Sequence, residues 1–235
     1  MQDKLIVALD DATLDQAKTL MKQLEGVVTY YKIGFEFFTA YGWEAVNQVR
    51  KSGAKIFLDL KLHDIPTTVA KTAAVICDHE IEMFNVHALG GLEMMKEVRK
   101  TVDEKTTGRK KPAVIAVTVL TSHTEETLSA QLGVSRNVKD QVLHLAGLAC
   151  EAGLDGVVSS PKEIEVLRKK FPKDFLIVTP GIRPAGSDPG DQKRIFGPRE
   201  AVDAGSSHIV VGRPITASPD PREAALQILK SICIS

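Results

Sequence analysis

The chain of 235 residues is long enough for one large α/β domain, and its content of 43% hydrophobic and 26% charged residues is typical of a globular protein with a sizeable core. Lysine plus arginine equals aspartate plus glutamate at 30 each, so the basic excess typical of nucleic-acid-binding proteins is absent. The three cysteines match no metal or disulfide spacing, and no apolar run approaches the roughly 18 residues of a membrane span. We expect a cytoplasmic protein, because the first residues show no secretory signal.

Strand-like apolar runs alternate with helical patterns from end to end of the sequence. The predicted strands are Leu5–Leu9, Val28–Ile33, Lys55–Leu60, Met83–His87, Val114–Val119, Gly156–Ser159, Leu176–Thr179 and His208–Val211. The predicted helices are Thr13–Leu24, Thr67–Cys77, Leu92–Val102, Val138–Ala152, Lys162–Lys170, Arg199–Ala204 and Pro221–Ile232. Eight strands with intervening helices predict a closed parallel (β/α)8 TIM barrel, with residues 1–235 forming one catalytic domain. A doubly wound open sheet is the alternative.

The catalytic groups of such a barrel come from the C-terminal ends of its strands and the loops that follow. At these positions the sequence has Asp10, Lys32, Asp59, Lys61, Asp64, Asn85, His87, Thr118, Thr121, Ser122, Arg183 and Arg213. Charges of both signs therefore converge on one face of the predicted barrel.

The stretch 56–66 is the most informative of these strand ends. An apolar run leads into Asp59 and Lys61, which are two residues apart and so point to one side of a regular strand, and Asp64 follows in the loop before Pro66. Two carboxylates around one ammonium at the end of a buried strand are expensive to assemble. The cluster therefore indicates a functional site rather than an exposed ion pair on an edge strand.

Other charged strand ends leave alternatives open. Lys32 lies inside an apolar run and needs a carboxylate partner, for which Asp59 and Asp10 are candidates. Asp10 is nearly as well explained as the N-cap of helix 13–24. His63 and His87 lack a spaced third metal ligand, which favours hydrogen-bonded structural histidines over a metal site.

The loops after the last two predicted strands resemble a phosphate-binding site. Gly181 and Gly212 allow backbone N–H groups to approach an anion, and Arg183 and Arg213 offer two-pronged contacts to phosphate oxygens. One Gly–Arg pair alone is as easily a solvated turn, but two pairs in the two loops that bind phosphate in this fold favour a phosphate ester as substrate.

The charges of the 56–66 stretch suit decarboxylation without an electron-sink cofactor. A substrate carboxylate placed against Asp59 is destabilised by its like charge, and loss of carbon dioxide leaves a carbanion that Lys61 can protonate. The sequence contains no glycine-rich dinucleotide fingerprint and nothing that marks a pyridoxal-phosphate lysine. Composition and spacing thus predict a cofactor-free carbanion enzyme that acts on a phosphate ester.

At these residues the chain resembles the orotidine 5′-phosphate decarboxylase family, in its bacterial single-function form without a fused transferase domain. The matching segments span nearly the whole chain in the family's order: 8–10, 32–34, 57–68, 85–88, 117–122, 179–183 and 210–215. The Asp-Leu-Lys-Leu-His-Asp-Ile-Pro-x-Thr block from Asp59 to Thr68 is the most specific of them.

The resemblance implies a role for each matching residue in converting orotidine 5′-monophosphate to UMP, without metal or cofactor. Lys61 would donate the proton, Asp59 would oppose the substrate carboxylate, and Lys32 would complete the charge network and touch the ribose. Asp64, Ile65 and Thr68 would reach into the partner subunit's site of an obligate homodimer. The remaining contacts would come from Asp10 for the ribose, Thr121 and Ser122 for the pyrimidine, and Arg183, Gln192, Gly212 and Arg213 for the phosphate, with 184–193 as a closing loop.

Two other functions are weighed against this one. Magnesium-dependent sugar-phosphate enzymes of the same superfamily share an Asp-x-Lys-x-x-Asp motif, but they have a metal-binding glutamate where this chain has Lys32. A non-catalytic phosphate-ligand-binding barrel would bind UMP without turnover. Retention of both Asp59 and Lys61 speaks against it, because simple binding needs no carboxylate facing an anion.

Overall fold

The computed structural model describes residues 2–10, 12–184 and 196–233. Its strands are β1 (Leu5–Ala8), β2 (Tyr30–Gly34), β3 (Lys55–Leu62), β4 (Met83–His87), β5 (Ala113–Val117), β6 (Gly156–Val158), β7 (Leu176–Thr179) and β8 (His208–Val211). They follow one another in chain order, and β1 pairs in parallel with β8, which closes the order into a barrel. The predicted (β/α)8 barrel is confirmed, and the open-sheet alternative is wrong.

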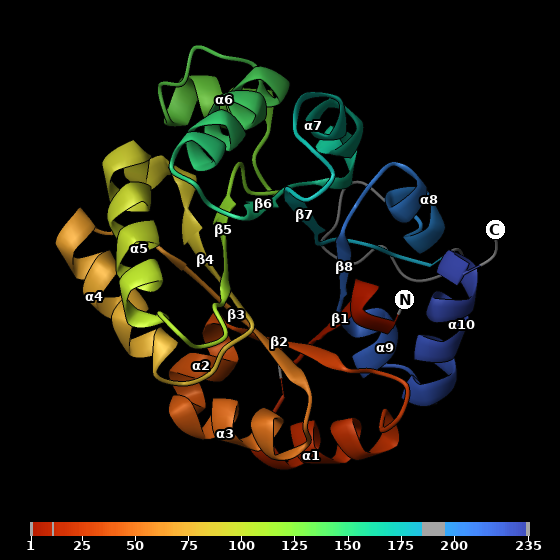
Figure 1. The fold of residues 1–235 in the computed structure, drawn as a ribbon. Coiled ribbons are helices and arrows are strands. Elements are labelled where there is room, and N and C mark those ends of the chain that lie inside the picture. The colour runs from red at the N-terminus through yellow and green to blue at the C-terminus, as the bar shows by residue number, and fades with distance from the viewer. Residues whose placement is uncertain (1, 11, 185–195, 234–235) are drawn as a thin grey trace. The chain divides into compact units, whose positions relative to one another are not determined.

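The chain divides into two compact units, of which the first comprises residues 1–60 and 179–235. Here β8, β1, β2 and β3 pair in parallel, with Val211 opposite Val7, Ala8 opposite Lys32, and Gly34 opposite Asp59. The helices of this unit are α1 (Leu14–Gln23), α2 (Phe35–Tyr41), α3 (Trp43–Lys51), α8 (Pro198–Asp203), α9 (Arg213–Thr216) and α10 (Pro221–Cys233), with the 3₁₀ turn η1 (Gln2–Lys4). In this unit α10 packs against α8 and α9 (Figure 1).

The second unit comprises residues 61–178 and contains parallel pairs from β4 through β7. Its helices are α4 (Pro66–Cys77), α5 (Gly91–Lys105), α6 (Val138–Glu151) and α7 (Ile164–Lys170), with the 3₁₀ turns η2 (Ala88–Gly90) and η4 (Pro161–Glu163) and the π-helical turn η3 (Thr127–Gln131). Helices α4 and α5 lie side by side (Figure 1).

Most strands are buried along nearly their whole length, as expected when both faces of a parallel sheet are covered, whereas the last three residues of β3 are partly exposed. In β1, β2 and β4 every residue is buried. The charged side chains of Lys32 and Asp59 therefore lie within buried strands, where an unpaired charge is costly. No helix in the described ranges is both long and apolar enough to cross a bilayer.

Candidate active site

Lys32 on β2 is held between two carboxylates. Its Nζ lies 2.7 Å from Oδ2 and 3.0 Å from Oδ1 of Asp10, and 3.1 Å from Oδ2 of Asp59. The side chains of Lys32 and Asp59 are 9% and 11% exposed, whereas that of Asp10 is 39% exposed. Both predicted partners of Lys32 are thus found, and the N-cap alternative for Asp10 is wrong, because Thr13 caps α1 through a capping box with Gln16.

The two carboxylates keep Lys32 charged despite its burial. Desolvation acts to lower the pKa of Lys32, but attraction from Asp59 and then Asp10 outweighs it and holds the pKa above the ordinary value of a lysine. The group is therefore a fixed positive charge at neutral pH. Through these two ion pairs Lys32 connects Asp10, which follows β1, with Asp59 on β3.

Lys61, two residues after Asp59 on β3, has a backbone conformation that the sequence did not predict. Its φ of 49° is in the left-handed region, which a residue with a Cβ adopts only at a cost. Its backbone N–H donates to Oδ1 of the fully buried Asn85 on β4 at 2.7 Å. Strained backbone of this kind is found preferentially at functional sites.

The start of α4 presents the residues predicted to serve a partner subunit. Oδ1 of Asp64 accepts the backbone N–H of Ile65 at 2.6 Å, and Pro66 opens the helix. Asp64, Ile65 and Thr68 are all exposed, and Ile65 is one of the few large apolar side chains in the described chain that face solvent.

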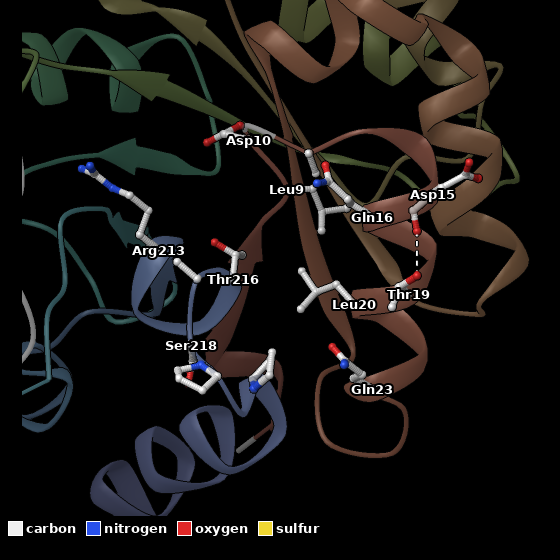
Figure 2. A pocket seen from close by; sticks show the side chains of 14 residues that line it. Leu9, Asp10, Asp15, Gln16, Thr19, Leu20, Gln23, Arg213, Thr216 and Ser218 are labelled. Atoms are coloured by element: carbon white, nitrogen blue, oxygen red, sulfur yellow. Dashed lines mark hydrogen bonds between the residues drawn. The ribbon is translucent and has the colours of Figure 1, made fainter.

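Asp10 and Arg213 line one pocket in the first unit, with a volume of about 700 Å³. Figure 2 shows Asp10 after β1 and Arg213 on α9 at one end of this pocket, and Ser218 and Gln23 toward the other. The lining between them is mostly neutral, with the hydroxyl and amide groups of Gln16, Thr19 and Thr216. Arg213 provides the positive charge in this pocket that an anionic ligand would contact.

Of the other residues predicted to bind phosphate, the structure describes Gly181, Arg183 and Gly212. Gly181 follows β7 with a φ of 78°, a conformation that glycine adopts without strain. Arg183 is buried, and its backbone N–H donates to the carbonyl of Phe196 at 3.0 Å. Gly212, at the end of β8, has space for a Cβ, with Ala8 Cβ 3.7 Å away. Gln192 and residues 185–193 of the predicted loop lie outside the described residues.

The remaining predicted residues follow β4 and β5. Thr121 and Ser122 are exposed in the loop after β5, and Thr118 is buried. Nδ1 of His87 accepts the backbone N–H of Leu89, and its ring stacks on His63 at a centroid distance of 5.5 Å. Burial, followed by the charge of neighbouring His63, lowers the pKa of His87 to about 4, so its imidazole is neutral. Among the described residues no group of three potential ligands is placed to hold a metal ion.

A parallel (β/α)8 barrel with a buried carboxylate–ammonium pair at its strand ends is the architecture of a TIM-barrel enzyme. Comparison with known proteins gives the family. Residues 3–228 match the model of the orotidine 5′-phosphate decarboxylase / HUMPS family, and the chain belongs to this family.

Curated relatives and solved structures agree with this assignment. The orotidine 5′-phosphate decarboxylase of Moorella thermoacetica is 48% identical over 98% of this chain and 92% of its own length. That of Geobacter metallireducens is 47% identical over 98% of this chain and 96% of its own length. The crystal structure of the Lactobacillus acidophilus orotidine 5′-phosphate decarboxylase has a TM-score of 0.87 at 38% identity, covering 99% of this chain and 100% of that one.

Two residues of this region have contacts that sequence reasoning did not identify. Gly34, at the end of β2, lies where a Cβ would come within 2.0 Å of Asp10 Oδ1 and 2.7 Å of Lys32 Nζ. Asn85 is among the predicted strand-end residues, and the structure adds its contact with the Lys61 backbone. The signals in the sequence were a glycine directly after an apolar strand and an amide inside one.

Proposed function

We propose that this chain catalyses the cofactor-free decarboxylation of orotidine 5′-monophosphate to UMP and carbon dioxide, the last step of de novo pyrimidine nucleotide synthesis. The observation that carries the proposal is the buried Lys32 held by Asp10 and Asp59, with Lys61 two residues further along β3. Family membership and full-length relatives named for this activity support it.

In the proposed reaction the negative charge of Asp59 acts first and the positive charge of Lys61 acts second. Asp59 opposes the substrate carboxylate, and Lys32 fixes Asp59 in a buried position where like-charge repulsion is weakly screened. The bond between the ring carbon and the carboxylate breaks, its electron pair stays on the ring carbon, and carbon dioxide leaves. Lys61 stabilises the developing carbanion and gives it a proton from its ammonium group.

Substrate binding is assigned to the groups at the ends of the other strands. Asp10 and Lys32 bind the ribose, Thr121 and Ser122 the pyrimidine, and Arg183, Gln192, Gly212 and Arg213 the phosphate. The pocket that Asp10 and Arg213 share supports placing ribose and phosphate subsites next to each other. Binding energy gained at the phosphate can then serve a reaction step at the distant ring.

The active form is proposed to be a cytoplasmic homodimer in which Asp64, Ile65 and Thr68 complete the partner's site, with residues 1–235 acting as one catalytic domain. Exposure of all three residues at the start of α4 supports their availability to a partner, since an exposed isoleucine gains free energy when it is covered.

The direct test follows the absorbance of orotidine 5′-monophosphate with purified, chelator-treated protein. Conversion to UMP without added metal is the expected result. If a folded protein gives no conversion, the assay is repeated with magnesium and keto-sugar phosphates, because the family also includes the HUMPS group. Turnover of those substrates alone would overturn the proposal, and UMP binding without any turnover would indicate the non-catalytic alternative.

A further inference from the structure

We infer that Asn85 is a positioning residue for Lys61: its side-chain carbonyl holds the backbone of the lysine in the left-handed conformation from which the lysine acts. The inference rests on the proposed role of Lys61 as proton donor. It adds a residue on a neighbouring strand that has no contact with the substrate in the proposed function.

The backbone of Lys61 needs an external constraint. A φ of 49° is disfavoured at any residue other than glycine, because the Cβ atom comes too close to the backbone. Such a conformation persists only where surrounding contacts determine it. In a regular strand the chain would continue with side chains alternating between the two faces, so the left-handed turn at Lys61 changes the direction of the backbone that follows.

Asn85 supplies such a contact. It is fully buried on β4, and its Oδ1 accepts the backbone N–H of Lys61 at 2.7 Å, a short distance for an amide hydrogen bond. The side-chain carbonyl thus gives the backbone N–H of Lys61 an acceptor at the end of β3. Lys61 lies at the part-buried end of β3, where a backbone N–H without an acceptor is costly, and this couples the conformation of Lys61 to the presence of Asn85.

The next inward residue of β4 makes a second contact with the same segment. Asn85 and His87 are two apart and so share a face of β4, and the ring of His87 stacks on His63, two residues after Lys61. The backbone N–H of Leu89 fixes the ring of His87 through Nδ1. Alternate residues of β4 therefore contact alternate residues of the 61–63 segment, and Asn85 is the one that meets the lysine itself.

The test compares Asn85→Leu, which keeps the branched shape and removes the acceptor, with Asn85→Asp, which keeps an oxygen acceptor in the form of a carboxylate. Val86→Ala is the matched control, because Val86 is a fully buried neighbour on the same strand whose truncation destabilises β4 without touching Lys61. The readouts are kcat and KM for orotidine 5′-monophosphate, the Kd of UMP, and hydrogen exchange of the Lys61 amide in ¹⁵N-lysine-labelled protein without ligand.

For Asn85→Leu we expect kcat to fall by about tenfold or more with the UMP Kd within about threefold of the parent, because a displaced proton donor affects the chemical step rather than product binding. Asn85→Asp should recover part of kcat, and Val86→Ala should lower the Tm with kcat within about twofold of the parent. The Lys61 amide should exchange faster in Asn85→Leu only.

Equal losses of kcat in Asn85→Leu and Val86→Ala, or no recovery by Asn85→Asp, would overturn the inference. If Asn85→Leu does not fold, Asn85→Ser replaces it, since its shorter side chain withdraws the acceptor. A parent protein that fails to decarboxylate the substrate contradicts the proposed function, and the exchange rate of the Lys61 amide then still decides whether Asn85 holds that backbone.

Discussion

The ammonium of Lys32 lies 3.1 Å from a carboxylate oxygen of Asp59, and both side chains are about nine-tenths buried. Neither charge would be stable there alone, because removing one partner of a buried pair leaves an uncompensated charge. The two charges therefore depend on each other inside the barrel, and loss of either one leaves the other without its partner. In the proposed reaction it is the carboxylate of Asp59 that faces the carboxylate of the substrate.

Lys32→Met should destabilise the protein by about 3 kcal/mol, because Asp59 loses its buried partner. Lys18→Met is the matched control: Lys18 also pairs with an aspartate, Asp15, at 3.2 Å, but both side chains are exposed, and such pairs contribute about 1 kcal/mol or less. Urea denaturation at pH 7 measures both. Equal losses of unfolding free energy in the two variants would show that the Lys32 pair has no special energetic role.

Gly34→Ala should displace the carboxylate of Asp10 and the ammonium of Lys32, because a Cβ there would come within 2.0 Å of Asp10 Oδ1 and 2.7 Å of Lys32 Nζ. The φ of Gly34 is −89°, which any residue adopts, so the glycine serves to leave space for the Asp10–Lys32 pair. The alanine methyl would push away the carboxylate of the part-exposed Asp10 side chain and weaken UMP binding by about tenfold. Gly147→Ala is the control, since nothing lies within 4 Å of its added Cβ. Calorimetric titration with UMP checks both variants, and parent-like affinity in Gly34→Ala would contradict the role of that space.

His208 should make the protein less stable in mild acid. Burial lowers its pKa to about 4, below the ordinary 6.5, so the unfolded chain binds more protons between these two values. Stability is therefore complete above pH 6.5 and falls by roughly 2–3 kcal/mol as the pH drops to 4. Urea midpoints across this range should fall less steeply in His208→Gln, with a residual slope from His87, whose pKa is also about 4. Identical slopes in parent and variant would exclude His208 as the cause.

A mixture of Lys61→Ala and Asp64→Ala proteins tests the proposed shared site. Each homodimer carries one lesion in both sites, whereas a hybrid dimer has one site with both lesions and one with neither. Activity should therefore reappear on mixing, up to about half the parent value per hybrid dimer, because one of its two sites is intact. Subunit exchange is verified with differently labelled chains, and absence of activity despite proven exchange would place Asp64 in its own subunit's site.

The sequence was sufficient to predict the barrel, because strands buried on both faces read as apolar runs and the helical periodicity separates them. It did not predict α2 and α3, which interrupt the simple strand–helix alternation between β2 and β3. Gly42, with a φ of 53°, ends α2 and directly precedes α3. A single glycine between aromatic residues was not enough to predict that one helix ends and another begins there.

The site was predictable where charge alone identified it. A lysine inside an apolar run required carboxylate partners, and the structure provides Asp10 and Asp59. The left-handed backbone of Lys61 was not predictable, since lysine carries no preference for that region and the constraint comes from Asn85, which is distant in sequence. The space at Gly34 likewise depends on where two charged side chains meet.

The most direct test of the central claim is decarboxylation of orotidine 5′-monophosphate by Lys61→Ala, measured beside its UMP affinity and its unfolding transition. We expect a folded protein that still binds UMP and whose kcat falls by roughly 10²–10⁴-fold or more, since general acid catalysis contributes about that much. A kcat within a few-fold of the parent would contradict the assignment of Lys61 as proton donor and, with it, the proposed mechanism.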